Sequence, residues 1–172
     1  MLKILQKIFK IGVITEGVPQ KKDAIQLEEI GKACKKIIEA RLKESLAIRQ
    51  VDAGSCNACE LEIHALNNSF YDIERFGIHF VASPRHADLL LVTGPVSKHM
   101  EAALITAYNS TPDPKLVIAV GDCGVCGGEF GCSYASCGAV SNVIPVDGTI
   151  SGCPPTPLDL LQGILEVLKK TW

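Results

Sequence analysis

The sequence lacks the features of a membrane-spanning, secreted or disordered protein. No apolar stretch reaches the length of about 18 residues that a transmembrane helix needs. No secretory signal is recognisable, because Lys3, Lys7 and Lys10 interrupt the apolar N-terminus. Repeats and low-complexity tracts are absent, and apolar residues make up 47% of the chain. We therefore expect a soluble globular domain that meets a membrane only from outside.

The chain also lacks a strong net charge, which is −2 over 172 residues, enough for one α/β domain of ordinary size. The charges are unevenly placed. Residues 1–50 carry eleven Lys and Arg against six Asp and Glu, whereas residues 51–172 carry six against thirteen. An acidic body excludes nucleic acid as the expected main partner. The basic segment fits anionic lipid or an acidic protein.

Periodicity divides the chain into a helical N-terminal part and an α/β body. Residues 1–10 place apolar side chains on one helical side, which predicts a short docking helix or a terminus that caps the core. Apolar residues at steps of three and four predict a second helix over about residues 23–46, with Cys34 on its buried stripe. We predict a membrane-proximal helical extension over residues 1–46 and a body over residues 47–172.

The body alternates short apolar runs with helical patterns. This alternation predicts a doubly wound, mostly parallel sheet. The expected strands are residues 47–53, 78–82, 89–92, 116–120 and 143–146, and the expected helices are residues 58–67, 97–108 and 156–170.

Eight cysteines are many for a chain of this length, and without a secretory signal we expect ligands, redox groups or core residues rather than disulfides. Four of them fall just past expected strand ends: Cys56, Cys59, Cys123 and Cys153. Because ligands gather at the carboxyl ends of parallel strands, these thiols can meet in one crevice. Four thiolates at one point predict a zinc ion or an iron–sulfur cluster.

Spacing alone leaves both metals open. A zinc site built from two Cys-x-x-Cys pairs would use Cys56, Cys59, Cys123 and Cys126. That set leaves Cys153 unused, although Pro154 follows it as a proline follows the last ligand of bacterial ferredoxins. Glycines around the single cysteines would let backbone N–H groups approach cluster sulfurs, which favours iron–sulfur. The compact ferredoxin spacing is absent.

Of five further residues, four have two interpretations each. Glu60 and Glu62 follow the second cysteine at an expected helix start, where acids stabilise the helix end, although Glu60 also fits a proton path or a partner contact. Arg85 fits a partner contact or an ordinary surface position. Cys132 and Cys137 are interpreted as small packing residues, with a second redox role as the alternative.

Four segments of the body, in order, resemble the small subunit of membrane-bound energy-converting [NiFe] hydrogenases of the Ech and CO-induced type. The segments are DAGSCNACELEI, SPRHADLLLVTGP, GDCGVCGGEFGCSYASCG and VIPVDGTISGCPPTPLDLLQGIL. The resemblance covers about residues 47–168. These small subunits are similar in turn to the 20 kDa cluster-bearing subunit of respiratory complex I.

The resemblance implies a flavodoxin-like α/β domain that holds one [4Fe–4S] cluster. By position, the implied ligands are Cys56, Cys59, Cys123 and Cys153. Cys126 falls where related proteins commonly have a residue that is not a ligand. In complex I the first two ligands are adjacent, whereas here Asn57 and Ala58 separate them. That departure favours the hydrogenase branch over a quinone-reducing one.

The resemblance also implies partners and a place in the cell. The chain would pass electrons between a ferredoxin-like polyferredoxin subunit and a [NiFe] hydrogenase large subunit, and it would hold no nickel–iron site itself. Integral-membrane ion-translocating subunits and the cytoplasmic face of the cell membrane are the implied surroundings. Two alternatives remain at this stage: a complex I-type quinone oxidoreductase subunit, and a zinc-stabilised flavodoxin-like binding module.

Overall fold

The computed structural model describes residues 21–171, so the helix expected over residues 1–10 lies outside the described part. Five strands form a parallel sheet in the order β2-β1-β3-β5-β7. They are β1 (Leu46–Asp52), β2 (Ile78–Phe80), β3 (Leu89–Thr93), β5 (Leu116–Val120) and β7 (Gly148–Ile150). This arrangement is the flavodoxin-like order 2-1-3-4-5, which confirms the predicted fold class.

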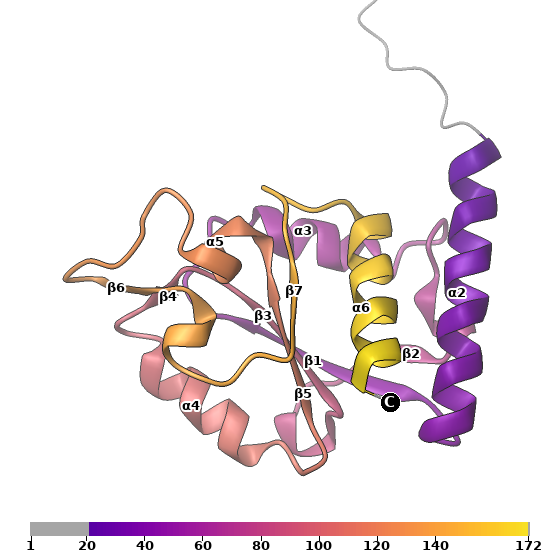
Figure 1. Ribbon diagram of the computed structural model, residues 1–172, viewed down its shortest axis with the longest axis horizontal. Helices are drawn as coiled ribbons and strands as arrows, with labels where there is room; N and C mark the ends of the chain where they lie inside the picture. Colours follow the sequence, from indigo (N-terminus) through magenta and orange to yellow (C-terminus); the bar gives the residue numbers. More distant parts are fainter. Residues whose placement is uncertain (1–20, 172) are drawn as a thin grey trace, which may run out of the picture.

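Helices cover both faces of the sheet and make three layers (Figure 1). Alternate side chains of β3 show the division, because neighbouring strand residues point to opposite faces. Leu89 and Leu91 join one core cluster, and Leu90 and Val92 join the other. The first face is covered by α2 (Lys21–Arg41), α3 (Ala58–Ala65) and α6 (Pro157–Thr171), and the second by α4 (Glu101–Ser110).

The N-terminal helix α2 packs beside α6, as Figure 1 shows, and shares its core with the sheet. Leu27 and Ile38 are almost completely buried, and Cys34 lies between them along the helix with no exposed surface. Burial raises the pKa of the Cys34 thiol to about 12, so this cysteine behaves as a small core residue. The division of the chain at residue 46 stays a prediction.

The strand expected over residues 143–146 is wrong. This segment follows a 3₁₀ turn (Val140–Asn142), and Ile144 inserts into the core on the α4 side. The strand begins instead at Gly148, just after Asp147, whose N–H donates to the Val117 carbonyl at 2.8 Å. The Asp147 carboxylate accepts the Val117 N–H, also at 2.8 Å. These two contacts with β5 fix the entry to β7, and a local apolar pattern does not reveal them.

A second difference lies before α4, which begins at Glu101 rather than at Ser97. Val96–Ser97 (β4) pairs with Ser136–Gly138 (β6) in a small antiparallel sheet that sequence periodicity did not predict. Both strands are too short for a period of two to be visible. No helix within residues 21–171 has the length and apolar character needed to cross a membrane.

Candidate metal centre

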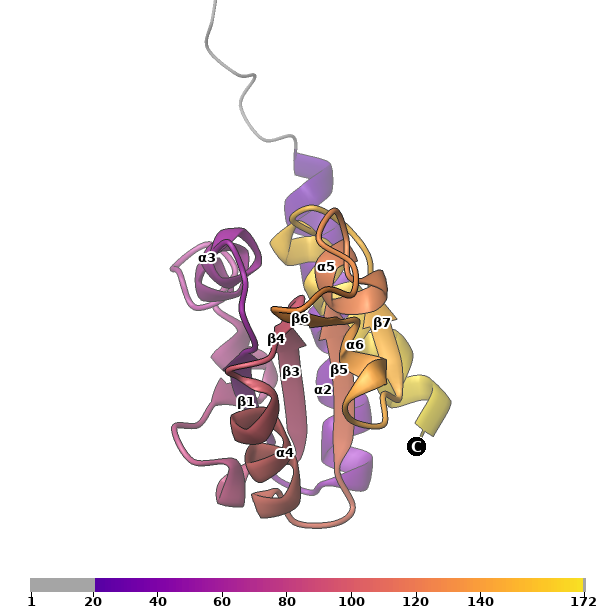
Figure 2. The same ribbon diagram turned by 90° about the vertical axis from the view of Figure 1, so that its left-hand side faces the viewer.

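The four candidate ligands lie on three loops at the carboxyl end of the sheet. Cys56 and Cys59 follow β1, and Cys59 lies in the first turn of α3. Cys123 lies in the short helix α5 (Gly121–Cys126), which begins where β5 ends, and Cys153 follows β7. Figure 2 shows α3 and α5 beyond the arrowheads of β3 and β5. The parallel topology therefore collects thiols that are far apart in sequence.

Electrostatic effects connect the four thiols. Burial raises the pKa of Cys59 to about 11, with further increases from Glu60 and from the other three candidate ligands. Burial also raises the pKa of Cys123, and the thiols of Cys153 and Cys56 add to this effect. Cys59 is therefore protonated at neutral pH and must release its proton to bind a metal.

The four thiols lie near one another at this edge of the sheet without converging on a single point. Within residues 21–171, no three His, Cys, Asp or Glu side chains lie close enough together to hold one metal ion. Cys56 and Cys153 are exposed, whereas Cys59 and Cys123 are partly buried. The centre is thus open to solvent on one side, where a cofactor or a partner protein can reach it.

Two glycines bring the backbone directly against the sulfurs of the two partly buried cysteines, Cys59 and Cys123. A Cβ atom at Gly121 would lie 2.6 Å from the Cys59 Sγ, and one at Gly128 would lie 2.6 Å from the Cys123 Sγ. Both residues have positive φ, +75° and +53°, which favours glycine. The close approach is what an iron–sulfur site uses, because nearby backbone N–H groups can bond cluster sulfurs. The thiol set and its glycine surroundings therefore fit such a cluster.

Asp122 connects two of the ligand loops and was missed by sequence reasoning. Its carboxylate accepts the Gly152 N–H at 2.8 Å, and its own N–H donates to the Gly152 carbonyl at 2.9 Å. Asp122 directly precedes Cys123, and Gly152 directly precedes Cys153. An acid beside a ligand was the available signal, but its partner, 30 residues away, could not be identified from it.

We expect Asp122→Ala to loosen the centre. The substitution removes a hydrogen bond to a charged group, for which a loss of about 1.5–3 kcal/mol is typical. The loops of Cys123 and Cys153 then separate more easily, so bound iron is lost faster to a chelator. Asp113→Ala is the control, because the Asp113 side chain is 83% exposed and lies between α4 and β5. Equal rates of iron loss from both variants would contradict this role.

The loop before Cys56 is shaped by Asp52 at the end of β1. Its carboxylate accepts the N–H groups of Gly54 and Ser55 at 2.9 and 3.0 Å, and the Ser55 hydroxyl accepts the Asn57 N–H at 3.1 Å. Burial by itself raises the pKa of the Asp52 carboxyl, but these hydrogen bonds outweigh it and lower the pKa. The conformation of the loop before Cys56 is therefore fixed by hydrogen bonds to the Asp52 carboxylate.

The acids and the arginine predicted near the centre differ in environment. Glu60 is only 4% exposed, and within the described residues its carboxylate oxygens have no hydrogen-bond partner. It therefore makes no side-chain hydrogen bond at the helix start. Glu62 is partly buried, and Arg85 is exposed in a 3₁₀ turn that follows β2.

Three cysteines outside the candidate ligand set lie in α5 or in the segment that follows it. Cys126 is exposed, and its thiol donates to the Asp122 carbonyl at 3.1 Å. Cys137 is buried in the core on the α4 side, as a packing residue is, whereas Cys132 is exposed.

The fold and the positions of the thiols define a class of protein, a flavodoxin-like α/β domain that presents four thiols at the carboxyl edge of its sheet. The chain belongs to the family described as NADH ubiquinone oxidoreductase, 20 Kd subunit, whose model matches residues 56–167. Members are subunits of oxidoreductase complexes of the hydrogenase and complex I type. The 20 kDa complex I subunits bind an iron–sulfur cluster.

Individual relatives come from both branches. The chain is 46% identical over 128 residues to formate hydrogenlyase subunit 7 of Escherichia coli, covering 74% of this chain and 50% of that one. It is 47% identical over 120 residues to a probable membrane-bound hydrogenase subunit, mbhJ, of Pyrococcus furiosus, covering 70% and 72%. It is 44% identical over 113 residues to an NADH-quinone oxidoreductase subunit of Herpetosiphon aurantiacus, covering 65% and 63%.

A solved structure of similar fold is a chain of the membrane-bound sulfane sulfur reductase, an archaeal respiratory membrane complex. Its TM-score is 0.65 at 35% identity, with 80% of this chain and 77% of that chain covered. This chain spans half the length of the Escherichia coli relative. The comparisons confirm the resemblance found in the sequence. They support the role of a membrane-bound hydrogenase or complex I-like subunit.

Proposed function

We propose that this chain is the electron-transfer small subunit of a membrane-bound [NiFe] hydrogenase. Its four ligands for one [4Fe–4S] cluster are Cys56, Cys59, Cys123 and Cys153. The observation that carries this proposal is the collection of these thiols, from three separate loops, at one edge of the parallel sheet. When bound, the cluster supplies one-electron transfer, at a potential of roughly −400 mV for the ferredoxin type.

The residues of this chain set the properties of the site through burial, charge and backbone contact. Partial burial of Cys59 shields one side of the centre from water, and Gly121 and Gly128 let the backbone lie against the sulfurs. Glu60 and Asp122 each raise the pKa of the cysteine beside them. Negative charge in these positions opposes the addition of an electron, which favours a low potential.

An electron carrier without a substrate site needs a partner on each side. We propose a ferredoxin-like subunit on one side and a large subunit with the nickel–iron centre on the other. Integral-membrane ion-translocating subunits complete the complex, with this chain on the cytoplasmic face of the membrane. The basic character of residues 1–50 supports docking of the N-terminal part against membrane or membrane subunits. Membership of the relatives in membrane-bound complexes supports the same placement.

Metal analysis together with electron paramagnetic resonance tests the proposal. For the anaerobically purified complex we expect about four iron and about four acid-labile sulfide assigned to this chain, the complement of a cubane cluster. Reduction with dithionite is expected to produce a low-temperature spectrum of the cluster. One zinc ion without sulfide would overturn the proposal and favour a zinc-stabilised module.

The second candidate is a subunit of a complex I-type quinone oxidoreductase, favoured by the 44% identity to the NADH-quinone oxidoreductase relative of Herpetosiphon aurantiacus. The same cluster is expected in both cases. The sequence of the large subunit that copurifies with this chain decides between them. Cys-x-x-Cys pairs near both of its ends indicate nickel ligands and a hydrogenase, whereas their absence indicates quinone chemistry.

A further inference from the structure

Two cysteines outside the candidate metal centre face each other across a small hairpin. Cys132 and Cys137 form an isolated antiparallel bridge at the base of a turn whose tip includes the fully exposed Tyr134. Between them, Ser133 and Ser136 exchange backbone hydrogen bonds of 2.9 and 3.4 Å. The two serines are therefore a hydrogen-bonded pair of this ladder.

The backbone spacing of the two cysteines suits a disulfide. Hydrogen-bonded and non-hydrogen-bonded pairs alternate along an antiparallel ladder, so Cys132 and Cys137 are a non-hydrogen-bonded pair. The Cα atoms of such pairs lie about 4.5 Å apart, and their side chains are closer than in the other kind of pair. Disulfides occur at Cα separations of about 4.4–6.8 Å. A bond between the two sulfurs thus needs no large movement of the backbone.

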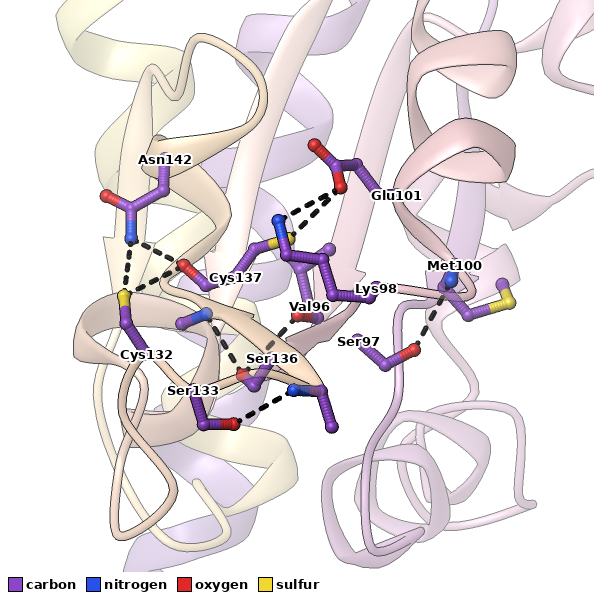
Figure 3. Close-up of polar contacts among 12 residues, drawn as sticks. Val96, Ser97, Lys98, Met100, Glu101, Cys132, Ser133, Ser136, Cys137 and Asn142 are labelled. Atoms are coloured by element: carbon purple, nitrogen blue, oxygen red, sulfur yellow. Dashed lines mark hydrogen bonds and ion pairs between the residues drawn. The ribbon is translucent and has the colours of Figure 1, made fainter.

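In the reduced form each thiol has its own polar contacts, which Figure 3 shows. The Cys132 Sγ donates to the Cys137 carbonyl at 3.1 Å and lies 3.6 Å from the Asn142 Nδ2. The Cys137 Sγ donates to the Glu101 Oε2 at 3.4 Å. The sulfurs point toward different neighbours, so side-chain rotation must accompany bond formation.

A lysine and a glutamate lie where they can activate the buried thiol. Lys98 Nζ lies 3.3 Å from the Glu101 Oε2. Hydrogen bonds with Cys137 and Glu101 raise the pKa of Lys98, and hydrogen bonds with Cys137 and Lys98 lower the pKa of Glu101. The Cys137 thiol therefore lies beside a carboxylate that accepts its hydrogen bond and an ammonium group that can stabilise a thiolate.

We propose that Cys132 and Cys137 form a reversible disulfide by exchange with low-molecular-weight disulfides such as oxidised glutathione. The exposed Cys132, as thiolate, attacks one sulfur of the small disulfide and expels a thiolate, which leaves a mixed disulfide on Cys132. Cys137, as a thiolate beside the Lys98 ammonium group, attacks the Cys132 sulfur and expels the second small thiolate. The two protons of the cysteines end on the two expelled thiolates. Two protein thiols are thus oxidised while one small disulfide is reduced to two thiols.

The proposed bond lies beside the metal centre and uses none of its candidate ligands. The segment Gly127–Gly131 joins the hairpin to α5, which carries Cys123, and Gly128 touches that ligand. Closing the base of the hairpin would fix the turn around Tyr134 without removing a thiol from the centre. The proposal is therefore independent of which metal the four candidate ligands bind.

Thiol mapping of the full chain in its complex tests the proposal. The complex is equilibrated with glutathione mixtures of increasing oxidised fraction, quenched with acid and alkylated, and its peptides are analysed by mass spectrometry. For the wild type we expect a link between Cys132 and Cys137, seen as the loss of two hydrogen masses and of both alkylation sites. Cys137→Ser is expected to retain glutathione on Cys132, because the resolving thiol is gone. Cys126→Ser, which removes another exposed thiol, is expected to behave as the wild type.

Glu101→Gln separates the proposed chemistry from mere proximity. This variant keeps the shape of the side chain but removes the ion pair that holds Lys98 beside Cys137, so it is expected to prolong the mixed disulfide on Cys132 before the link forms. The wild-type result decides by itself, even where Cys137→Ser folds poorly. If wild-type Cys132 keeps glutathione as long as the Cys137→Ser variant does, or if neither cysteine is modified at any ratio, the proposal is wrong.

Discussion

Replacing Cys153 with serine is expected to empty the candidate cluster site while the fold remains. Cys153 is exposed at the sheet edge and belongs to neither core cluster, and serine has nearly the same shape. The variant removes one of four thiolates. Substitution of a residue that only supports a metal ligand lowers metal affinity by about 10–100-fold. Loss of a ligand itself is therefore expected to lower the affinity for the cluster by more than about 100-fold. Iron and sulfide in this chain should fall to near zero, together with the part of the low-temperature resonance spectrum that this cluster contributes.

Cys126→Ser is the matched control for this experiment. Cys126 is also exposed and lies close to Cys123 in sequence, and the paired zinc alternative requires it. We expect this variant to keep its iron and sulfide. For the cluster-free forms, the unfolding free energies of both variants are expected to lie within about 0.5 kcal/mol of the wild type. The reverse pattern, with metal lost from Cys126→Ser and retained in Cys153→Ser, would establish the zinc set instead.

Gly128→Ala is expected to have the second large effect. Its Cβ would lie 2.6 Å from the Cys123 Sγ and 3.2 Å from the Cys123 Cα, so either the ligand or the loop must move. Positive φ adds a strain of about 1–2 kcal/mol for a residue with a side chain. Because the collision involves the ligand sulfur itself, we expect iron and sulfide content to drop severalfold, while the melting temperature of the cluster-free form falls by only a few degrees.

Gly131→Ala is the control that separates the steric contact with Cys123 from the backbone strain of a positive φ. Gly131 has φ +52°, nearly the +53° of Gly128, but a Cβ there would meet nothing within 4 Å. Both variants thus carry the same backbone cost, and only one touches a ligand. We expect Gly131→Ala to retain its cluster, as measured by iron, sulfide and visible absorption. Similar losses in both variants would show that loop strain, rather than contact with Cys123, governs the site.

Local patterns were sufficient for most of the fold. The strands β3 and β5 are buried on both faces, as strands in the middle of a parallel sheet are. Their sequences are therefore continuous apolar runs, which predict a strand without tertiary information. The helix α6 has strong amphipathic character, and it begins at Pro157, inside the expected range. The prediction of the last strand, Gly148–Ile150, was wrong. The run before it is more apolar and so resembled a strand, but it is a loop whose residue Ile144 packs into the core.

Strand and helix periods are local properties of the chain, and they were enough to predict the type of domain. Cysteines after strand ends are local too, and they suggested a metal centre. What lies against those cysteines became visible only in the three-dimensional structure. The contact of Asp122 with Gly152, the backbone of Gly128 on Cys123, and the pairing of Cys132 with Cys137 beside Glu101 depend on loop conformation and on strand order. Such contacts join residues whose proximity comes from the packing of the sheet, and no local pattern carries that information.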